Sequence, residues 1–130
     1  MIGVAAYLAL TGLQRVLESR EAKQRAEYAR RISPGAPLKE RLQQLARVRT
    51  EEGYMAEVRT ESPGTFLFIE NHCPICAAAT VCQGFCATEL DLFKSVLGAN
   101  ASVERTEHIV SGDRRCVYRV TAKRPTAKRR

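Results

Sequence analysis

Tryptophan is absent from this sequence, and aromatic residues make up only 6% of it. We therefore expect a core built mainly from Leu, Val, Ala and a few Phe side chains. The chain has 130 residues, which is enough for one domain with a modest core but too short for two. It also lacks a Gly-rich phosphate loop, a nucleophile elbow and a pair of catalytic carboxylates, so we expect that it is not an enzyme.

A membrane span and a secretory signal are both missing at the apolar start of the chain. Residues 1–17 contain only Gln14 and Arg15 as strongly polar residues, but their charge-free stretch is shorter than the ~20 residues that a span requires. No positively charged segment precedes this stretch, as a secretory signal would require. We expect a soluble, cytoplasmic protein that makes no membrane contact, in a reducing compartment where cysteines stay free of disulfides.

The net charge of +7 does not indicate a nucleic-acid-binding surface. Residues 122–130 carry five positive charges and no acidic residue, which leaves only +2 on the remainder of the chain. We therefore expect a short, basic, disordered tail behind a body of nearly balanced charge.

The first 35 residues predict one long helix. Apolar residues recur in a heptad-like stripe, which a charged helical stretch then continues up to the sequence Ser33-Pro34-Gly35. The stripe consists of Ile2, Ala6, Ala9, Leu13 and Val16. The remaining residues are too few to cover so long an apolar helix, so we expect it to form the contact of a homodimer. The alternatives are a contact with another domain and a core helix of the monomer.

Residues 36–121 predict an α+β domain. A second helix through Leu42 is expected to end at Gly53, and two strands then form a hairpin around residues 62–64. A short helix at Ala77–Ala79 and another that ends at Gly98 precede a second hairpin, whose strands are residues 103–110 and 116–120. The expected order after the long helix is α-β-β-α-α-β-β, with a mainly antiparallel four-stranded sheet.

Cysteine is the residue type that points to chemistry. Four of the five cysteines lie within fourteen residues at C-x2-C-x5-C-x3-C spacing. The fifth opens the last predicted strand, where alternation places it on the same face as Tyr118 and Val120. The five cysteines are Cys73, Cys76, Cys82, Cys86 and Cys116. Such clustered thiols are typical of a soft metal ion or an iron–sulfur cluster, and spacing alone does not separate zinc from [4Fe–4S].

Two other interpretations of the cysteines remain open. A strand followed by Cys73-Pro74-Ile75-Cys76 and a helix is similar to the start of a glutaredoxin-like thiol oxidoreductase. That fold needs a later cis-proline, and the next proline here is Pro125, in the tail. Single cysteines, Cys82 above all, can also be small buried side chains without chemistry.

The two histidines are weaker candidates. His72 adjoins Cys73 and is an alternative to Cys76 and Cys82 as a fourth ligand. His108 falls in a charged predicted strand, so we do not expect it to be a ligand.

Several separated blocks resemble one known family. They are residues 70–79, with Asn71-His72-Cys73-Pro74-Ile75, residues 86–93, which begin Cys86-Ala87-Thr88-Glu89, and residues 103–108 and 112–120, with Gly112-Asp113-Arg114-Arg115-Cys116. Together these blocks are similar to the C-terminal sensor half of SufR-like, ArsR/DeoR-type winged-helix transcriptional regulators, over about residues 36–121.

The resemblance implies a cluster-sensing module of a transcriptional regulator. It makes Cys73, Cys86 and Cys116 the first choice of ligands for a [4Fe–4S] cluster, with Cys76 or Cys82 as the fourth. Asn100 stands where well-known members have a further cysteine. The printed residues include no winged helix before Pro34, so DNA binding is expected only through such a domain. The alternative is a structural zinc-binding interaction module that uses Cys73, Cys76, Cys82 and Cys86.

Overall fold

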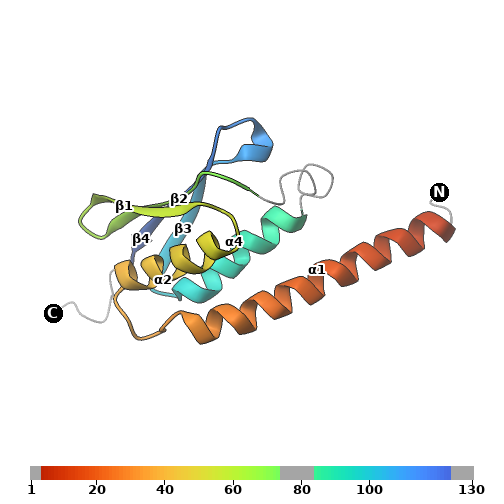
Figure 1. Ribbon diagram of the computed structural model, residues 1–130, viewed down its shortest axis with the longest axis horizontal. Coiled ribbons are helices and arrows are strands. Elements are labelled where there is room, and N and C mark those ends of the chain that lie inside the picture. The colour runs from red at the N-terminus through yellow and green to blue at the C-terminus, as the bar shows by residue number, and fades with distance from the viewer. Residues whose placement is uncertain (1–3, 74–83, 124–130) are drawn as a thin grey trace.

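The structure is a computed structural model, and it describes residues 4–73 and 84–123. Its elements follow one another as two helices, a strand pair, a helix and a second strand pair (Figure 1). In order they are α1 (Val4–Arg31), α2 (Leu38–Glu51), β1 (Ala56–Ser62), β2 (Thr65–Glu70), α4 (Gly84–Leu97), β3 (Ala101–Glu107), the 3-10 helix η1 (Ile109–Ser111) and β4 (Cys116–Ala122).

The four strands form one sheet in the order β1-β2-β4-β3, and all neighbouring strands are antiparallel. The prediction of an α+β fold with an antiparallel four-stranded sheet is therefore confirmed. The two central strands, β2 and β4, are the two most buried, as their apolar sequences indicated. The β1–β2 turn lies at residues 62–65, where a turn was predicted.

The strand predicted over residues 103–110 is wrong at both ends. β3 begins at Ala101 and ends at Glu107, after a register irregularity between Arg105 and Glu107. The chain then leaves the sheet because the His108 N–H donates to Asp113 Oδ2 at 2.7 Å instead of pairing with a strand. Residues 109–111 consequently form the 3-10 helix η1.

The core lies between the helices and one face of the sheet. Figure 1 shows α1, α2 and α4 on the same side of the sheet. Three aromatic rings form the centre. Phe93 of α4 packs edge-on against Phe68 of β2, with ring centroids 5.5 Å apart, and against Tyr118 of β4, with ring centroids 4.9 Å apart. Cys116, Tyr118 and Val120 share this buried face, as the alternation of residues in β4 predicted.

Helix α1 adds to the core through its C-terminal part. Tyr28 is fully buried, and Ile32, just past the helix, is nearly so. Val16, three turns earlier, is 56% exposed. Figure 1 shows the N-terminal end of α1 reaching beyond the other elements. Within the described ranges, no helix combines the length and the apolar character needed to cross a membrane.

Two glycines end helices as predicted. Gly53 follows α2 with φ 100°, its N–H donates to Thr50 O at 3.0 Å, and the Tyr54 N–H donates to Arg49 O at 3.0 Å. This Schellman arrangement sets Tyr54 back over Arg49. Gly98 follows α4 with φ 88°, and the side chain of Arg41 donates to the Leu97 carbonyl there. The helix predicted at Ala77–Ala79 and the tail beyond Lys123 lie outside the described residues.

Replacing Gly98 by Ala is expected to destabilise the fold. An alanine there would have to adopt the left-handed backbone conformation of Gly98. Its β-carbon would also lie 3.0 Å from Arg41 Nη1, which caps α4. The left-handed conformation alone costs about 1–2 kcal/mol for a residue other than glycine. Urea denaturation should show a loss of at least that size for Gly98→Ala. Gly35→Ala is the matched control, because its β-carbon would meet nothing within 4 Å. Equal losses in the two variants would contradict the capping role.

Candidate thiol site and the buried ion-pair network

The described cysteines lie at one end of the sheet. Cys116 begins β4 and is buried, and Cys86, in the first turn of α4, is also buried. Cys73 is partly exposed and follows β2 by three residues. Cys76 and Cys82 fall outside the described residues.

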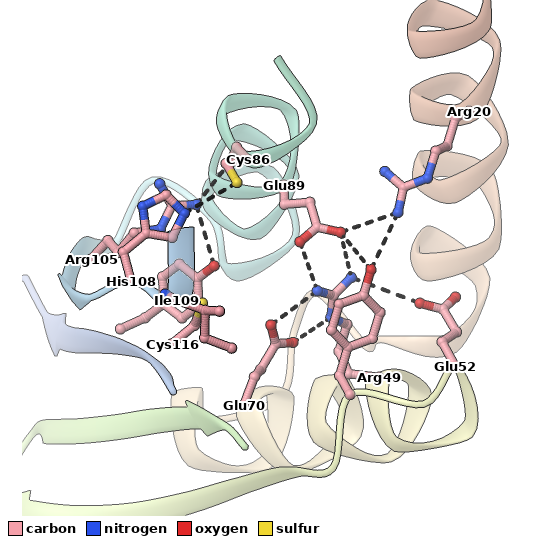
Figure 2. Close-up of polar contacts among 12 residues, drawn as sticks. Arg20, Arg49, Glu52, Glu70, Cys86, Glu89, Arg105, His108, Ile109 and Cys116 are labelled. Atoms are coloured by element: carbon pink, nitrogen blue, oxygen red, sulfur yellow. Dashed lines mark hydrogen bonds and ion pairs between the residues drawn. The ribbon is translucent and has the colours of Figure 1, made fainter. Parts of the chain in front are cut away.

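Strand register and helix packing bring these positions together. Glu70, the last residue of β2, pairs directly with Cys116, so the end of β2 and the start of β4 share one edge. Figure 2 shows Cys86, on α4, close to His108, Ile109 and Cys116. Across residues 4–73 and 84–123, however, no three Cys, His, Asp or Glu side chains are already grouped as metal ligands.

Two consecutive residues of the β3–β4 connection contact the two buried thiols. His108 Nε2 lies 3.1 Å from Cys86 Sγ, and the Ile109 N–H donates to Cys116 Sγ at 3.4 Å. The position of His108 was not expected from the sequence, because the predicted strand continued past it. Since β3 ends at Glu107, the following loop turns over the sheet edge and carries the imidazole to α4.

Arg105 supplies a positive charge beside the thiols. Its guanidinium donates to the Cys86 carbonyl oxygen at 2.8 Å and to the Tyr118 hydroxyl at 3.3 Å (Figure 2). Burial raises the pKa of the Cys116 thiol, and the Ile109 N–H and the charge of Arg105 oppose that rise. Burial and the nearby Arg105 lower the pKa of His108, against the attraction of Asp113. At neutral pH the His108 imidazole is therefore neutral, and burial keeps the Cys116 thiol protonated.

A fully buried arginine forms the second part of the site. Arg49 donates to both carboxylate oxygens of Glu70, at 2.5 and 3.1 Å, and to both oxygens of Glu89, at 3.0 and 3.4 Å. Glu70 and Glu89 are themselves buried. Arg49 therefore joins α2, β2 and α4 at one point (Figure 2).

Aromatic and cationic groups complete this network. The ring of Tyr54 covers the Arg49 guanidinium at 3.5 Å, and its hydroxyl donates to Glu89 at 2.8 Å. Arg20 of α1 donates to Glu89 at 3.2 Å, and Arg49 donates to the Tyr28 hydroxyl at 3.2 Å. Helices α1, α2 and α4 consequently meet at the same charges.

The pKa values of Glu70 and Glu89 shift in opposite directions. Burial raises the pKa of Glu70 to about 7, although Arg49 opposes it. Burial also acts on Glu89, but Arg49, Tyr54 and Arg20 together outweigh it and hold the pKa of Glu89 below its ordinary value. The difference follows from the number of donors, because among the described residues Glu89 accepts from three side chains and Glu70 from that of Arg49 alone.

The thiol site and the network share two elements. Glu70 is the strand partner of Cys116, and Glu89 lies one helical turn after Cys86. The charge of Glu70 also contributes to raising the pKa of Cys116. The network thus fixes the strand and the helix that carry the two buried thiols.

The sequence held a signal for Arg49 that was missed. The apolar stripe of α2 runs through Leu38, Leu42 and Leu45, and the next position on that stripe is Arg49. Likewise, Glu70 continues the inward alternation of Phe66 and Phe68. A charged residue in phase with a buried stripe indicates a buried ion pair, provided that partners of opposite charge recur on other elements.

No family model, curated protein or solved structure matches this chain. The resemblance to SufR-like regulators therefore stays a prediction. A function for the chain has to come from its geometry and from the chemistry of the donors described above.

Removing the charge of Arg49 is expected to destabilise the fold strongly. Arg49→Met leaves two buried carboxylates without their shared cation, and breaking a buried pair in this way costs about 3–5 kcal/mol. The matched control is Arg119→Met, because Arg119 pairs with Glu61 at 2.9 Å on the exposed surface. That loss should be below about 1 kcal/mol. Urea denaturation of both variants measures the difference, and similar losses would contradict the role of Arg49.

The raised pKa of Glu70 predicts a pH dependence of stability. Between its ordinary value of 4.5 and about 7, the folded protein holds a proton on Glu70 that the unfolded chain has lost. The free energy of unfolding should therefore fall as pH rises through this window. Glu70→Gln should remove that fall, measured by urea denaturation from about pH 5 to about pH 8.

Glu61→Gln is the control for this pH series. Glu61 is exposed, and its bond to Arg119 lowers its pKa, so its contribution is lost only as pH falls. The decline toward neutral pH should persist in this variant. A decline that also persists in Glu70→Gln would show that another group causes it.

Proposed function

We propose that this chain is a non-catalytic sensor module of a transcriptional regulator that holds an iron–sulfur cluster, [4Fe–4S], through its cysteines. The observation that carries the proposal is the burial of Cys86 and Cys116 at one sheet edge, although they are far apart in the sequence. Thiols are the protein ligands that iron–sulfur clusters take, and folding puts these two at the same edge. The blocks that resemble SufR-like regulators name the same two residues.

Cys73 is within reach of this edge. It lies three residues past Glu70, which is the strand partner of Cys116. Three residues span at most about 10 Å, so the Cys73 backbone lies no farther than that from Glu70. Cys76 and Cys82 remain candidates on their spacing alone.

The donors of the site suit a cluster. Thiolate sulfur is the ligand that iron–sulfur clusters take, and the cluster supplies one-electron chemistry when bound. Arg105 and the first turn of α4 place positive charge beside Cys86, which favours a thiolate and an anionic group. The buried setting of Cys86 and Cys116 keeps water away from the sulfurs.

The proposal includes a route from the thiols to α1. Glu89 follows Cys86 by one turn of α4 and accepts a bond from Arg20 of α1 at 3.2 Å. A change in how Cys86 is held would shift the first turn of α4 and so this bond. Loss of the cluster would therefore alter the packing of α1, which is the two-state element that a sensor needs.

Helix α1 is the proposed homodimer contact. Its Val16 is 56% exposed, and a surface groove of about 500 Å³ runs beside it. The groove is lined by Arg15, Val16, Ser19, Arg20, Lys23 and Gln24. In this proposal a winged-helix domain binds DNA, and α1 transmits the state of the thiol site to that domain. The proposed location is the reducing cytoplasm.

Protein purified without oxygen is expected to be brown, with broad absorption at roughly 400 nm from thiolate-to-iron charge transfer. Cys86→Ala and Cys116→Ala should each lower iron and sulfide content severalfold. Val96→Ala is the control, since it also truncates a partly buried side chain on α4. It should keep the full iron content.

Metal analysis of the same proteins separates the alternatives. One equivalent of zinc that survives Cys116→Ala would favour the structural zinc module of Cys73, Cys76, Cys82 and Cys86. Turnover of dithiol substrates that Cys73→Ser abolishes would favour an oxidoreductase. Protein that holds neither iron nor zinc would refute the sensor proposal.

A further inference from the structure

We infer that Cys86 is a peroxide-reactive thiol, with His108 as its base and Arg105 as the residue that holds the oxidised sulfur. The substrate class is a small hydroperoxide, and the product is a sulfenic acid on Cys86. This inference goes beyond the proposed function, because the reaction needs neither iron nor DNA. It takes place in chains that hold no cluster, so its outcome is separate from that of the sensor proposal.

The contact between Cys86 and His108 joins a nucleophile to a base. His108 Nε2 lies 3.1 Å from Cys86 Sγ, within the distance of a hydrogen bond to sulfur (Figure 2). A thiol attacks peroxides as its thiolate, and an adjacent imidazole is one of the groups that remove its proton. The pair therefore has the arrangement that nucleophilic cysteines use.

The loop after β3 determines where the imidazole lies. The His108 N–H donates to Asp113 Oδ2 at 2.7 Å, and the His108 carbonyl accepts from the N–H groups of Ser111, at 3.0 Å, and Asp113, at 3.1 Å. His108 is thus held at both its backbone groups. The base is consequently positioned beside the sulfur before a substrate arrives.

Arg105 brings a positive charge and an unused N–H group to the same place. Its guanidinium donates to the carbonyl oxygen of Cys86 at 2.8 Å. Its Nε is buried, and none of the described residues accepts a hydrogen bond from it. A buried donor without an acceptor is costly, so this N–H indicates a place for an additional acceptor. A sulfenate oxygen on Cys86 supplies an acceptor whose negative charge the guanidinium stabilises.

The oxidation step balances with the hydroperoxide as the one co-reactant. As the sulfur attacks the terminal oxygen, its proton passes to His108 Nε2, the S–O bond forms and the O–O bond breaks. The departing alkoxide, or hydroxide from hydrogen peroxide, takes that proton from the imidazolium. The sulfur of Cys86 is thereby oxidised to a sulfenic acid, and the peroxide is reduced to an alcohol or to water.

The burial of Cys86 limits the size of the substrate. Cys86 is only 8% exposed, so a hydroperoxide with a bulky organic group does not fit against its sulfur. Hydrogen peroxide is only slightly larger than water and is the best match. Selectivity for the small oxidant therefore comes from burial, and reactivity comes from His108 and Arg105.

Cys116 is the internal comparison. It is also buried, but the group that the structure places on its sulfur is a backbone N–H, that of Ile109, at 3.4 Å. A backbone N–H does not take a proton from a thiol. Cys116 is therefore expected to react with peroxide more slowly than Cys86.

The first test needs no variant. Hydrogen peroxide is added to the full chain, freed of metal with a chelator, and samples are denatured and alkylated at intervals. Tandem mass spectrometry then measures the thiol left at each cysteine. Cys86 should be lost at least about tenfold faster than Cys116, and dimedone, which traps sulfenic acids, should label Cys86. Loss of Cys86 no faster than that of Cys116 would overturn the inference.

Substitution of His108 tests the base. His108→Gln keeps a polar side chain that cannot take the proton, so the loss of the Cys86 thiol should slow about tenfold or more. His72→Gln is the matched control, because the chain has only two histidines and His72 is exposed. It should react at the rate of the parent protein. An unchanged rate in His108→Gln would refute the role of the imidazole.

Arg105 and substrate size give two further readouts. Arg105→Met should lower the yield of dimedone-labelled Cys86 severalfold, because the sulfenate loses its buried cation. Cumene hydroperoxide, with its bulky aromatic group, should oxidise Cys86 of the parent protein severalfold more slowly than hydrogen peroxide does. Equal rates with the two peroxides would refute the size limit.

The results separate this inference from the sensor proposal. Fast oxidation of Cys86 in a protein that never takes up iron keeps the inference and refutes the sensor function. A protein that binds a cluster, but whose cluster-free form oxidises Cys86 slowly, keeps the sensor function and refutes the inference alone.

Discussion

One buried guanidinium is shared between two buried carboxylates, and it joins α2, β2 and α4 at the end of the fold that carries the buried thiols. Arg49 of α2 bonds Glu70 of β2 and Glu89 of α4, and Arg20 of α1 reaches the same Glu89. Each of these charges is costly to bury alone, so the elements that carry them must dock together. The strand partner of Glu70 and the residue one turn before Glu89 are the two buried cysteines. The ion pair therefore decides where the thiols lie.

The charged network lies between the aromatic core and the thiols. The aromatic rings of Phe68, Phe93 and Tyr118 fill the centre of the core, and the charges adjoin them on the side toward α1. The thiols lie beyond, where β2 ends and the loop after β3 turns over the sheet edge.

Local sequence patterns predicted the helices and strands, but they did not predict the long-range contacts between them. Apolar periodicity and the glycines at 53 and 98 were sufficient for the helix ends, and alternation was sufficient for the inward face of β4. The length of β3 was missed because the bond from His108 to Asp113, which ends pairing there, depends on a turn five residues later. Arg49 was missed because its burial requires partners from β2 and α4, and no local window contains them.

The Arg49 network also restricts how this sequence can drift. Replacement of Arg49, Glu70 or Glu89 alone leaves opposite charge stranded in the interior, whereas replacing a whole buried ionic cluster by apolar residues is often neutral or stabilising. Sequences in which only one of the three residues has changed are thus disfavoured, although a sequence in which all three are apolar is tolerated. Homologues should accordingly fall into two groups, one that keeps all three residues and one that has exchanged them together.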